Sequence, residues 1–299
     1  MAKIITPAVT IFNDYEIPDY EGNKKVIDFL IEKGVDGILV LGSTGEFTVL
    51  HKDEKRRLFE FYRDYVGDRV ELYAGTRCMP FRDTLELSNL ATDLGYKGSL
   101  VIGPYYYAVD PESYFIYYNE LAKNTNGDIY IYNFPARSGS SITPELLKRL
   151  TEENKNIVGL KDSVPTFDHT ASLFKVIDPA KFQLYSGFDD NYLLNIQNGG
   201  AGGIGGLSNI VPEVWSRMVR ATNEGDRDTE ARCYAIITSL MPIYSLCTNS
   251  TFVMKQILKH RGLDINTRCI FPFNEAPAEV VAKACQLVDT ALERFQSIE

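Results

Sequence analysis

The sequence predicts an α/β protein of 299 residues, a (β/α)₈ TIM barrel with a C-terminal helical extension. Short apolar runs recur about every 25 to 33 residues, which is the spacing of a strand-plus-helix unit. Stretches of helical period lie between these runs, for example at residues 26–31 and 58–65. Eight such units in about 220 residues favour a closed barrel over an open, doubly wound sheet.

The predicted strands are Ile4–Val9, Gly37–Leu41, Val70–Ala74, Ser99–Ile102, Ile129–Tyr132, Ile157–Leu160, Phe182–Tyr185 and Ala201–Ile204. Runs without polar interruption are typical of parallel strands buried on both faces. Asp110-Pro111 and Thr143-Pro144 predict helix starts, because a capping side chain followed by proline favours a helix N-terminus.

After Val211 the strand signal ends and three helical patterns follow, at Asp226–Leu246, Thr251–His260 and Glu275–Phe295. We interpret them as the eighth barrel helix, or its extension, plus a helical appendage. No low-complexity linker separates them from the barrel. The expected organisation is therefore a catalytic barrel over residues 1–224 and a helical region packed on it over residues 225–299.

Composition excludes several classes of protein. The net charge of −9 argues against a nucleic-acid partner, and no basic cluster indicates a membrane surface. No apolar run reaches the roughly 20 residues of a membrane-spanning helix, and residues 1–9 do not resemble a signal peptide. The five cysteines are scattered and lack a CxxC pair, which fits neither a disulfide framework nor a zinc site. We expect a cytoplasmic protein.

The three histidines, His51, His169 and His260, lie among charged residues and are expected to be solvated surface side chains. Proton transfer would then depend on lysine, tyrosine, hydroxyl or carboxylate groups.

The most informative stretch is the apolar run 157–160 followed by Lys161-Asp162. A lysine at the end of a buried strand can be desolvated, which favours the neutral, nucleophilic amine. A lone lysine is more often solvated, since lysine is seldom buried without a partner. However, Lys161 is the only lysine at the C-terminal end of a predicted strand, and barrel active sites form at those ends.

Other strand ends carry matching chemistry. Residues 42–46, Gly-Ser-Thr-Gly-Glu, offer backbone amides and two hydroxyls that suit a small carboxylate. Tyr132 ends the fifth strand and Arg137 follows it, while Asp189 and Asp190 follow the seventh. Each signal alone is weak, because a tyrosine can pack, an arginine can pair at the surface, and aspartates can cap a helix.

The glycine-rich segment 200–205 matches GxGxxG but lies in the eighth strand rather than after the first, which disfavours a dinucleotide fold. We expect its glycines to leave room for substrate against Lys161, with Ile204 in the substrate site.

These residues together resemble the dihydrodipicolinate synthase / N-acetylneuraminate lyase family of Schiff-base aldolases. The resemblance covers essentially the whole chain. It rests on the GSTGE turn, PYY at 104–106, YNFPxxSG at 132–139, GLKD at 159–162 and SGFDD at 186–190 with the glycine-rich strand.

The resemblance implies that Lys161 forms a Schiff base with a 2-oxo acid, normally pyruvate. Tyr132 would carry the proton, assisted by Ser43 and by Tyr106, which in the family usually reaches in from a neighbouring subunit. Ser43 and Thr44 would hold the 2-oxo acid's carboxylate. A protonated imine makes the adjacent carbon acidic and the next carbon–carbon bond breakable, so no metal or organic cofactor is expected. The family implies a homotetramer, a dimer of dimers.

The resemblance leaves substrate choice open. Arg137 stands where dihydrodipicolinate synthases keep an arginine for aspartate semialdehyde, whereas Ser43 resembles the lyases. Gly187, Asp189 and Asp190 resemble the corresponding segment of the sugar-acid members, whose acidic residues accept hydrogen bonds from substrate hydroxyls. The segments 132–136, 157–162 and 186–190 look most like the 2-keto-3-deoxygluconate aldolase branch. We therefore expect reversible cleavage of a 2-keto-3-deoxy sugar acid to pyruvate and an aldehyde.

Three alternatives to this function remain. The nearest is 4-hydroxy-tetrahydrodipicolinate synthase, which condenses pyruvate with aspartate semialdehyde in lysine biosynthesis, and N-acetylneuraminate lyase follows. A barrel that binds a metabolite without turnover is more remote.

Overall fold

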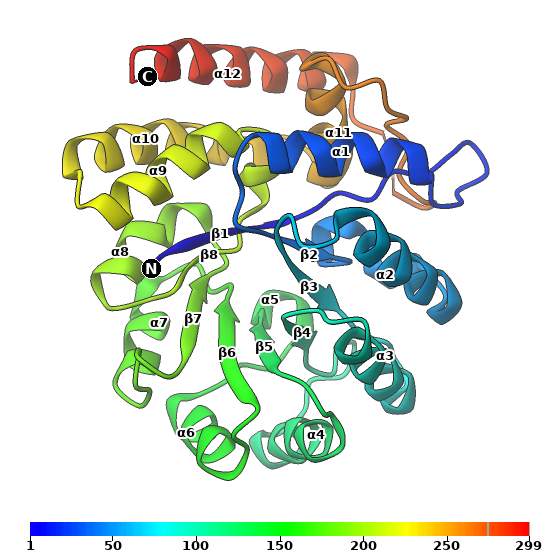
Figure 1. The fold of residues 1–299 in the computed structure, drawn as a ribbon, viewed down its shortest axis with the longest axis vertical. Coiled ribbons are helices and arrows are strands. Elements are labelled where there is room, and N and C mark those ends of the chain that lie inside the picture. The colour runs from blue at the N-terminus through cyan, green and yellow to red at the C-terminus, as the bar shows by residue number, and fades with distance from the viewer. Residues whose placement is uncertain (274, 299) are drawn as a thin grey trace.

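The computed structural model describes residues 1–273 and 275–298. In these residues, eight strands form a closed barrel (Figure 1). The strands are β1 Lys3–Pro7, β2 Gly37–Val40, β3 Glu71–Gly75, β4 Gly98–Ile102, β5 Ile129–Asn133, β6 Ile157–Asp162, β7 Gln183–Ser186 and β8 Gly202–Gly203. All neighbours pair in parallel and in chain order, with β8 closing on β1. Each strand begins and ends within two residues of its predicted run, so the predicted barrel is confirmed.

The helices around the barrel are α1 Tyr20–Glu32, α2 Lys52–Val66, α3 Phe81–Asp93, α4 Pro111–Asn124, α5 Pro135–Ser138, α6 Pro144–Glu153, α7 Phe167–Phe174, α8 Tyr192–Gln197 and α9 Pro212–Glu224. The two predicted starts are confirmed, because the Asp110 carboxylate accepts from backbone amides at the start of α4 and Thr143 does the same for α6. Helix α9 follows β8 and is the eighth barrel helix. The eighth barrel helix was predicted among the three helical patterns from Asp226 onward. Helix α9 ends at Glu224, before the first of these patterns, so the eighth helix lies earlier in the chain than predicted.

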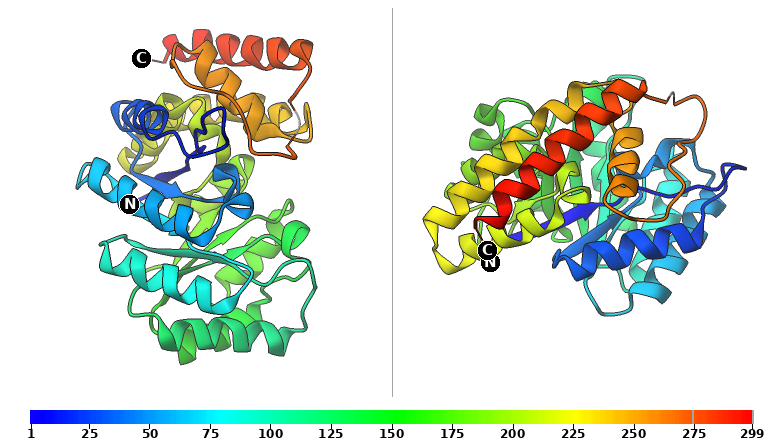
Figure 2. Two further views of the ribbon diagram at one scale, coloured as in Figure 1. Left: turned by 90° about the vertical axis from the view of Figure 1, so that its right-hand side faces the viewer. Right: turned by 90° about the horizontal axis from the view of Figure 1, so that it is seen from above.

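The C-terminal helices α10 Arg227–Ser239, α11 Ser250–His260 and α12 Ala278–Gln296 gather on one side of the barrel (Figures 1 and 2). The prediction of one helix over Asp226–Leu246 is wrong at its end, because the helix stops at Ser239 and a 3₁₀ turn covers Met241–Ser245. Pro242 explains the break, since proline cannot donate the helical hydrogen bond. Helix α12 begins just after Pro277 rather than at Glu275.

The C-terminal helices share the barrel's apolar core. Buried Val288 and Phe295 of α12 belong to the same cluster of apolar side chains as Ile38 of β2 and Trp215 of α9. None of the helices within the described residues combines the length and apolar character needed to cross a bilayer.

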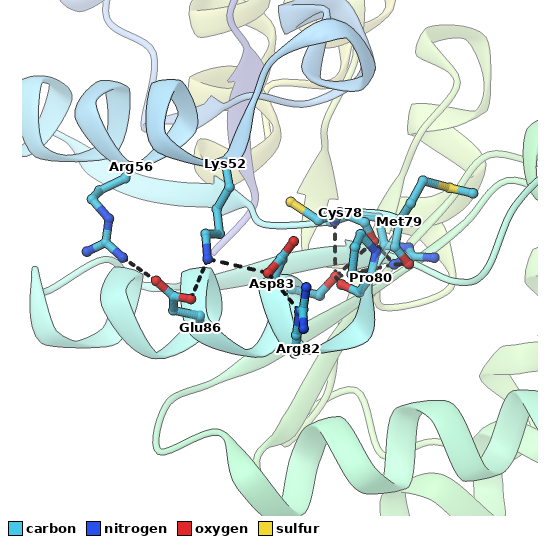
Figure 3. A network of polar contacts seen from close by, with 10 residues as sticks. Lys52, Arg56, Cys78, Met79, Pro80, Arg82, Asp83 and Glu86 are labelled. Atoms are coloured by element: carbon cyan, nitrogen blue, oxygen red, sulfur yellow. Dashed lines mark hydrogen bonds and ion pairs between the residues drawn. The ribbon is translucent and has the colours of Figure 1, made fainter.

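Helices α2 and α3 are joined at the surface by a network of ion pairs (Figure 3). Lys52 Nζ lies 2.7 Å from Glu86 and 3.4 Å from Asp83, and Arg56 pairs with the same Glu86. These side chains are partly solvated, so each pair contributes little to stability. The network nevertheless ties the start of α3 to α2, beside the loop that leaves β3.

Three tyrosine rings fill the inside of the barrel. The ring centroids of Tyr73 and Tyr130 are 5.3 Å apart, and those of Tyr130 and Tyr185 are 6.4 Å apart. These residues belong to β3, β5 and β7, which are not neighbouring strands. Because their rings nevertheless contact each other, the rings must lie inside the barrel. Gly98 of β4 and Gly159 of β6 leave the space, because a Cβ at either would lie 2.6 or 2.4 Å from the Tyr130 ring.

This packing fixes which way the following residues face. Side chains alternate along a strand, so Tyr132 and Lys161, each two residues beyond an inward position, also face the barrel interior. They are paired directly across β5 and β6. The next pair in register, Asn133 and Asp162, faces outward toward the helices.

Candidate active site

A cavity of about 900 Å³ opens at the C-terminal ends of the strands. The predicted site residues that line it are Ser43, Thr44, Tyr132, Arg137, Lys161, Gly187, Asp189 and Ile204. The fold therefore brings residues from β2, β5, β6, β7 and β8, or from the loops after them, into one space.

Lys161 lies inside this cavity rather than in bulk solvent, with only 5% of its surface exposed. The interpretation of a solvated lysine beyond the strand is therefore wrong, because β6 continues through Asp162. Its Nζ lies 4.4 Å from the centre of the Tyr132 ring, which is itself 5% exposed. Within the part of the chain that the structure describes, this nitrogen has no hydrogen bond and no ion pair.

The turn after β2 supplies hydroxyl groups. Ser43–Gly45 forms one 3₁₀ turn, closed by a hydrogen bond from the Gly45 amide to the Gly42 carbonyl. The side chains of Ser43 and Thr44 line the cavity, and neither hydroxyl has a hydrogen-bond partner among residues 1–273 and 275–298. Hydroxyls left open in this way can donate to an anionic ligand.

Arg137 is an exposed residue of the short helix α5 and lines the cavity beside Phe134. Its guanidinium carbon lies 5.9 Å from the centre of the Phe134 ring. Among the described residues it forms no ion pair, so the surface pair considered as an alternative is absent from that part of the chain. A guanidinium held by an aromatic face and open to the cavity suits a carboxylate.

Asp189 is a buried residue that lines the cavity. Its Oδ2 accepts a 2.6 Å hydrogen bond from the Tyr244 hydroxyl, while the buried Oδ1 has no hydrogen-bond partner among the described residues. Burial raises the pKa of this carboxyl to about 6. Its side chain does not cap α8, whose preceding residue Asn191 also provides no side-chain cap.

The glycine-rich strand makes room for protein side chains. A Cβ at Gly205 would lie 2.2 Å from Asp189 Oδ1, and one at Gly206 would lie 2.6 Å from the Tyr244 hydroxyl oxygen. The expectation that these glycines leave space for substrate against Lys161 is therefore wrong in its detail. They allow Asp189 and Tyr244 to approach the cavity wall.

Two predicted site residues lie outside the cavity. Tyr106, in the loop after β4, is 81% exposed and has a left-handed backbone with φ 80°. Asp190 is half-buried, and its backbone carbonyl accepts a hydrogen bond from Tyr234. The predicted roles of these two residues are not tested by a single chain.

The C-terminal region contributes more to the cavity than the sequence indicated. Its lining residues there are Met241, Tyr244, Cys247, Thr248, Asn249, Ser250, Thr251, Pro272, Phe273, Glu275, Ala276 and Pro277. Pro242 was the available signal, because it interrupts the predicted helix and frees the chain to turn toward the barrel.

A buried ion pair anchors this region. Lys255 Nζ of α11 lies 2.5 Å from Glu46 Oε1, and Glu46 Oε2 accepts from the Ile270 amide. No local pattern indicated this pairing, which joins residues 209 positions apart.

One histidine differs from its prediction. His169 was expected at the surface, yet only 20% of its side chain is exposed and its Nδ1 lies 3.0 Å from the Asp162 carboxylate. The other member of this pair is completely buried, so the prediction of a solvated histidine at this position is wrong.

The mouth of this barrel combines a buried lysine amine, a phenol and a hydroxyl-lined turn. These are the groups that a class I aldolase, a type of lyase, uses. The chain belongs to the Dihydrodipicolinate synthetase family, whose sequence profile matches residues 1–291. The predicted family is therefore confirmed.

Relatives within the family carry two kinds of name. YjhH of Escherichia coli K12, named a probable 2-dehydro-3-deoxy-D-pentonate aldolase, is 32% identical over 94% of each chain. YagE of the same strain, provisionally named a 2-dehydro-3-deoxy-D-gluconate aldolase, is 33% identical over 90% of each chain. A 4-hydroxy-tetrahydrodipicolinate synthase of Heliobacterium modesticaldum is 33% identical over 96% of this chain and 95% of its own.

The crystal structure of YagE in complex with pyruvate superimposes with a TM-score of 0.94. That comparison covers 98% of this chain and 99% of YagE at 31% identity. The backbone that surrounds the cavity is therefore shared with a protein that binds pyruvate.

Proposed function

We propose that this protein cleaves a 2-keto-3-deoxy sugar acid reversibly into pyruvate and an aldehyde through a Schiff base on Lys161. The observation that carries the proposal is the buried Lys161 amine, which has no hydrogen bond or ion pair among the described residues and lies over the Tyr132 ring in one cavity with Ser43 and Thr44. The names of YjhH and YagE and the pyruvate complex of YagE support the substrate class.

The chemistry follows from these groups. The neutral Lys161 amine adds to the C2 carbonyl carbon of the 2-keto acid, and uptake of one proton with loss of water leaves a protonated imine. The electrons of the C3–C4 bond then move toward the imine as a base takes the proton of the C4 hydroxyl, which releases the aldehyde. Tyr132 is the proposed proton carrier, since its hydroxyl has no hydrogen bond among the described residues. Protonation at C3 and hydrolysis return pyruvate and the free amine.

The remaining residues would position the substrate. Ser43 and Thr44 would bind the carboxylate next to the keto group, and Asp189 would accept hydrogen bonds from sugar hydroxyls. Tyr106, exposed on a single chain, is proposed to complete a neighbouring site within a homotetramer. A cytoplasmic location is part of the same proposal.

One observation favours a second function. Arg137 lines the cavity without an ion pair among the described residues, which suits the carboxylate of aspartate semialdehyde, and a synthase is among the relatives at 33% identity. Condensation of pyruvate with aspartate semialdehyde is therefore the alternative.

A substrate panel separates the two functions. The purified protein is incubated with 2-keto-3-deoxygluconate, a 2-keto-3-deoxypentonate, N-acetylneuraminate, or pyruvate with aspartate semialdehyde, and pyruvate is followed over time. Pyruvate release from the keto-deoxy acids is expected. Pyruvate consumption with aspartate semialdehyde, and no release from keto-deoxy acids, would overturn the proposal.

Arg137→Ala provides a second discriminator. Removing the guanidinium should abolish most activity of a synthase, because the aldehyde substrate loses its carboxylate partner. In a sugar-acid aldolase the same change should mainly alter KM. The measured split between kcat and KM on the best substrate therefore checks the choice independently.

A further inference from the structure

A polar cluster lies directly behind the proposed catalytic pair. Asn133 and Asp162 follow Tyr132 and Lys161 on their strands and are paired in register one step further along β5 and β6. Because side chains alternate, the cluster faces outward, between the barrel wall and α7. The Asp162 side chain is completely buried there.

The carboxylate of Asp162 has hydrogen-bond partners on both β5 and α7. Its Oδ1 accepts from Asn133 Nδ2 at 2.7 Å, and its Oδ2 accepts from the Thr170 hydroxyl at 2.6 Å. His169 Nδ1 lies 3.0 Å from the same Oδ2. The side-chain oxygen of Asn133 in turn accepts a hydrogen bond from the Ile142 backbone amide at 3.0 Å. The cluster thus joins β5, β6, α7 and the loop before α6.

The groups around His169 favour the protonated imidazole. Nδ1 faces the Asp162 carboxylate, and Nε2 faces the Ile142 carbonyl at 2.9 Å, with the Ser141 hydroxyl 3.3 Å away. Carboxylate and carbonyl oxygens only accept, so this arrangement favours a ring with protons on both nitrogens. The hydrogen bond to Asp162 accordingly raises the pKa of His169, against the opposing effect of burial. When protonated, this imidazole neutralises the charge of a buried carboxylate.

Backbone hydrogen bonds also connect Asp162 to the loop that lines the cavity. Its carbonyl accepts the amide of Gly187, a cavity-lining residue, at 2.8 Å, and the Asn133 carbonyl accepts the amide of Ser163 at 2.8 Å. The strand ends that carry Lys161 and Tyr132 are therefore bound to each other and to the next loop through one cluster.

We propose that His169, Asp162 and Asn133 form a positioning unit that holds the Lys161 amine against Tyr132 in the geometry needed for imine chemistry. This inference rests on the proposed function. None of the three side chains lines the cavity, so they are positioning residues and not catalytic ones. Loss of the unit should loosen the relation between amine and phenol, and a displacement of about 1 Å can reduce turnover by about 100-fold.

The test compares two His–Asp pairs of equal length. His169→Gln removes the imidazolium from the cluster, while His260→Gln removes the same group from the exposed His260–Asp289 pair, also 3.0 Å long. Asp162→Asn is the stronger variant, because it removes the charge with little change in shape. Each variant is assayed on the substrate identified by the panel, with kcat divided by the fraction of Lys161 that borohydride can trap with pyruvate.

We expect kcat per trapped site to fall about ten- to hundred-fold in His169→Gln and Asp162→Asn, with KM within about threefold of wild type. His260→Gln should retain wild-type kcat and KM. If Asp162→Asn does not fold, the partly exposed His169→Gln still provides the measurement.

The failures of the two proposals differ. A wild-type protein that traps no pyruvate overturns the proposed function and this inference together. A wild-type protein that works, with variants that lose only thermal stability and keep wild-type kcat per trapped site, overturns the positioning role alone.

Discussion

Two buried lysines of this chain have opposite surroundings. Lys255 of α11 is completely buried and has a carboxylate partner, Glu46, at 2.5 Å, a carbonyl partner, Arg268, at 2.9 Å, and the Phe12 ring at 4.8 Å. Lys161 of β6 is almost as buried, yet among the described residues its amine has no hydrogen bond and no ion pair and lies over the Tyr132 ring.

The difference distinguishes a lysine that stabilises the fold from a lysine that is available to react. A buried charge is normally retained only with a partner, because desolvation without compensation is costly. Lys255 satisfies this rule and ties the C-terminal helices to the turn after β2. Lys161 has no such partner. An amine without a hydrogen bond or ion pair can attack a carbonyl carbon, as a Schiff-base mechanism requires. We infer that the stability of the fold depends on the first lysine and activity on the second.

The largest expected effect is on activity. Lys161→Met should reduce aldol cleavage by about 10⁴-fold or more, because the nucleophile is lost. The free energy of unfolding should stay constant or rise, since the change removes a buried amine without a partner. Initial rates and urea denaturation measure the two quantities, and a large loss of stability would contradict the assignment of Lys161 as a chemical group.

Lys255→Met should have the reverse profile. Removing one member of a buried ion pair leaves an uncompensated charge on Glu46 and should cost about 3–5 kcal/mol of stability. The double variant Glu46→Gln/Lys255→Met should recover part of that loss, because the stranded carboxylate is gone. Equal denaturation midpoints for Lys255→Met and wild type would show that the pair is not structural.

Asp189 allows the cavity to be tested by pH. With a folded pKa of about 6, this carboxyl is ionised above pH 6 and can accept hydrogen bonds from substrate hydroxyls. We expect kcat/KM on the sugar acid to fall as pH drops below 6 in wild type, and this inflection to be absent in Asp189→Asn. An unchanged inflection in the variant would assign it to another group.

The same carboxyl affects stability with a defined sign. Its folded pKa is raised above the unfolded value of about 3.9, so the stabilisation it provides is fully present below that value and is lost as pH rises through about 6. Asp189→Asn should therefore remove this decline between pH 4 and 7, which denaturation at several pH values can measure.

A third buried lysine gives the smallest effect. Lys55 Nζ donates to the Arg77 carbonyl at 2.8 Å and lies 3.5 Å from Cys78 Sγ, and burial lowers its pKa. Since it has no ion pair among the described residues, Lys55→Met strands no carboxylate and should cost only about 1 kcal/mol. A loss as large as that of Lys255→Met would mean that burial, and not pairing, decides the effect.

Local patterns predicted the barrel and the centre of the site. Uninterrupted apolar runs indicated all eight strands, and the ends of β5 and β6 indicated Tyr132 and Lys161, because strand direction alone determines where those ends meet. Alternation along the strand then determines which of Lys161 and Asp162 faces inward.

Tertiary pairings could not be predicted in the same way. Tyr244 reaches Asp189 only because the chain turns after Pro242, and Glu46 meets Lys255 only once α11 packs on the barrel. His169 looks like a surface residue in sequence, because its partner Asp162 becomes buried only when β6 joins the sheet. Contacts of this kind depend on how elements pack in the folded chain, which local sequence patterns do not specify.

The central claim is that the amine of Lys161 reacts with pyruvate. The protein is incubated with pyruvate and borohydride, digested, and its peptides are weighed and sequenced by mass spectrometry. We expect one adduct per chain on Lys161, with the mass of pyruvate less water plus the two hydrogens of reduction, and none in Lys161→Met. An adduct on Lys55 or Lys255 instead, or no adduct in wild type, would contradict the account.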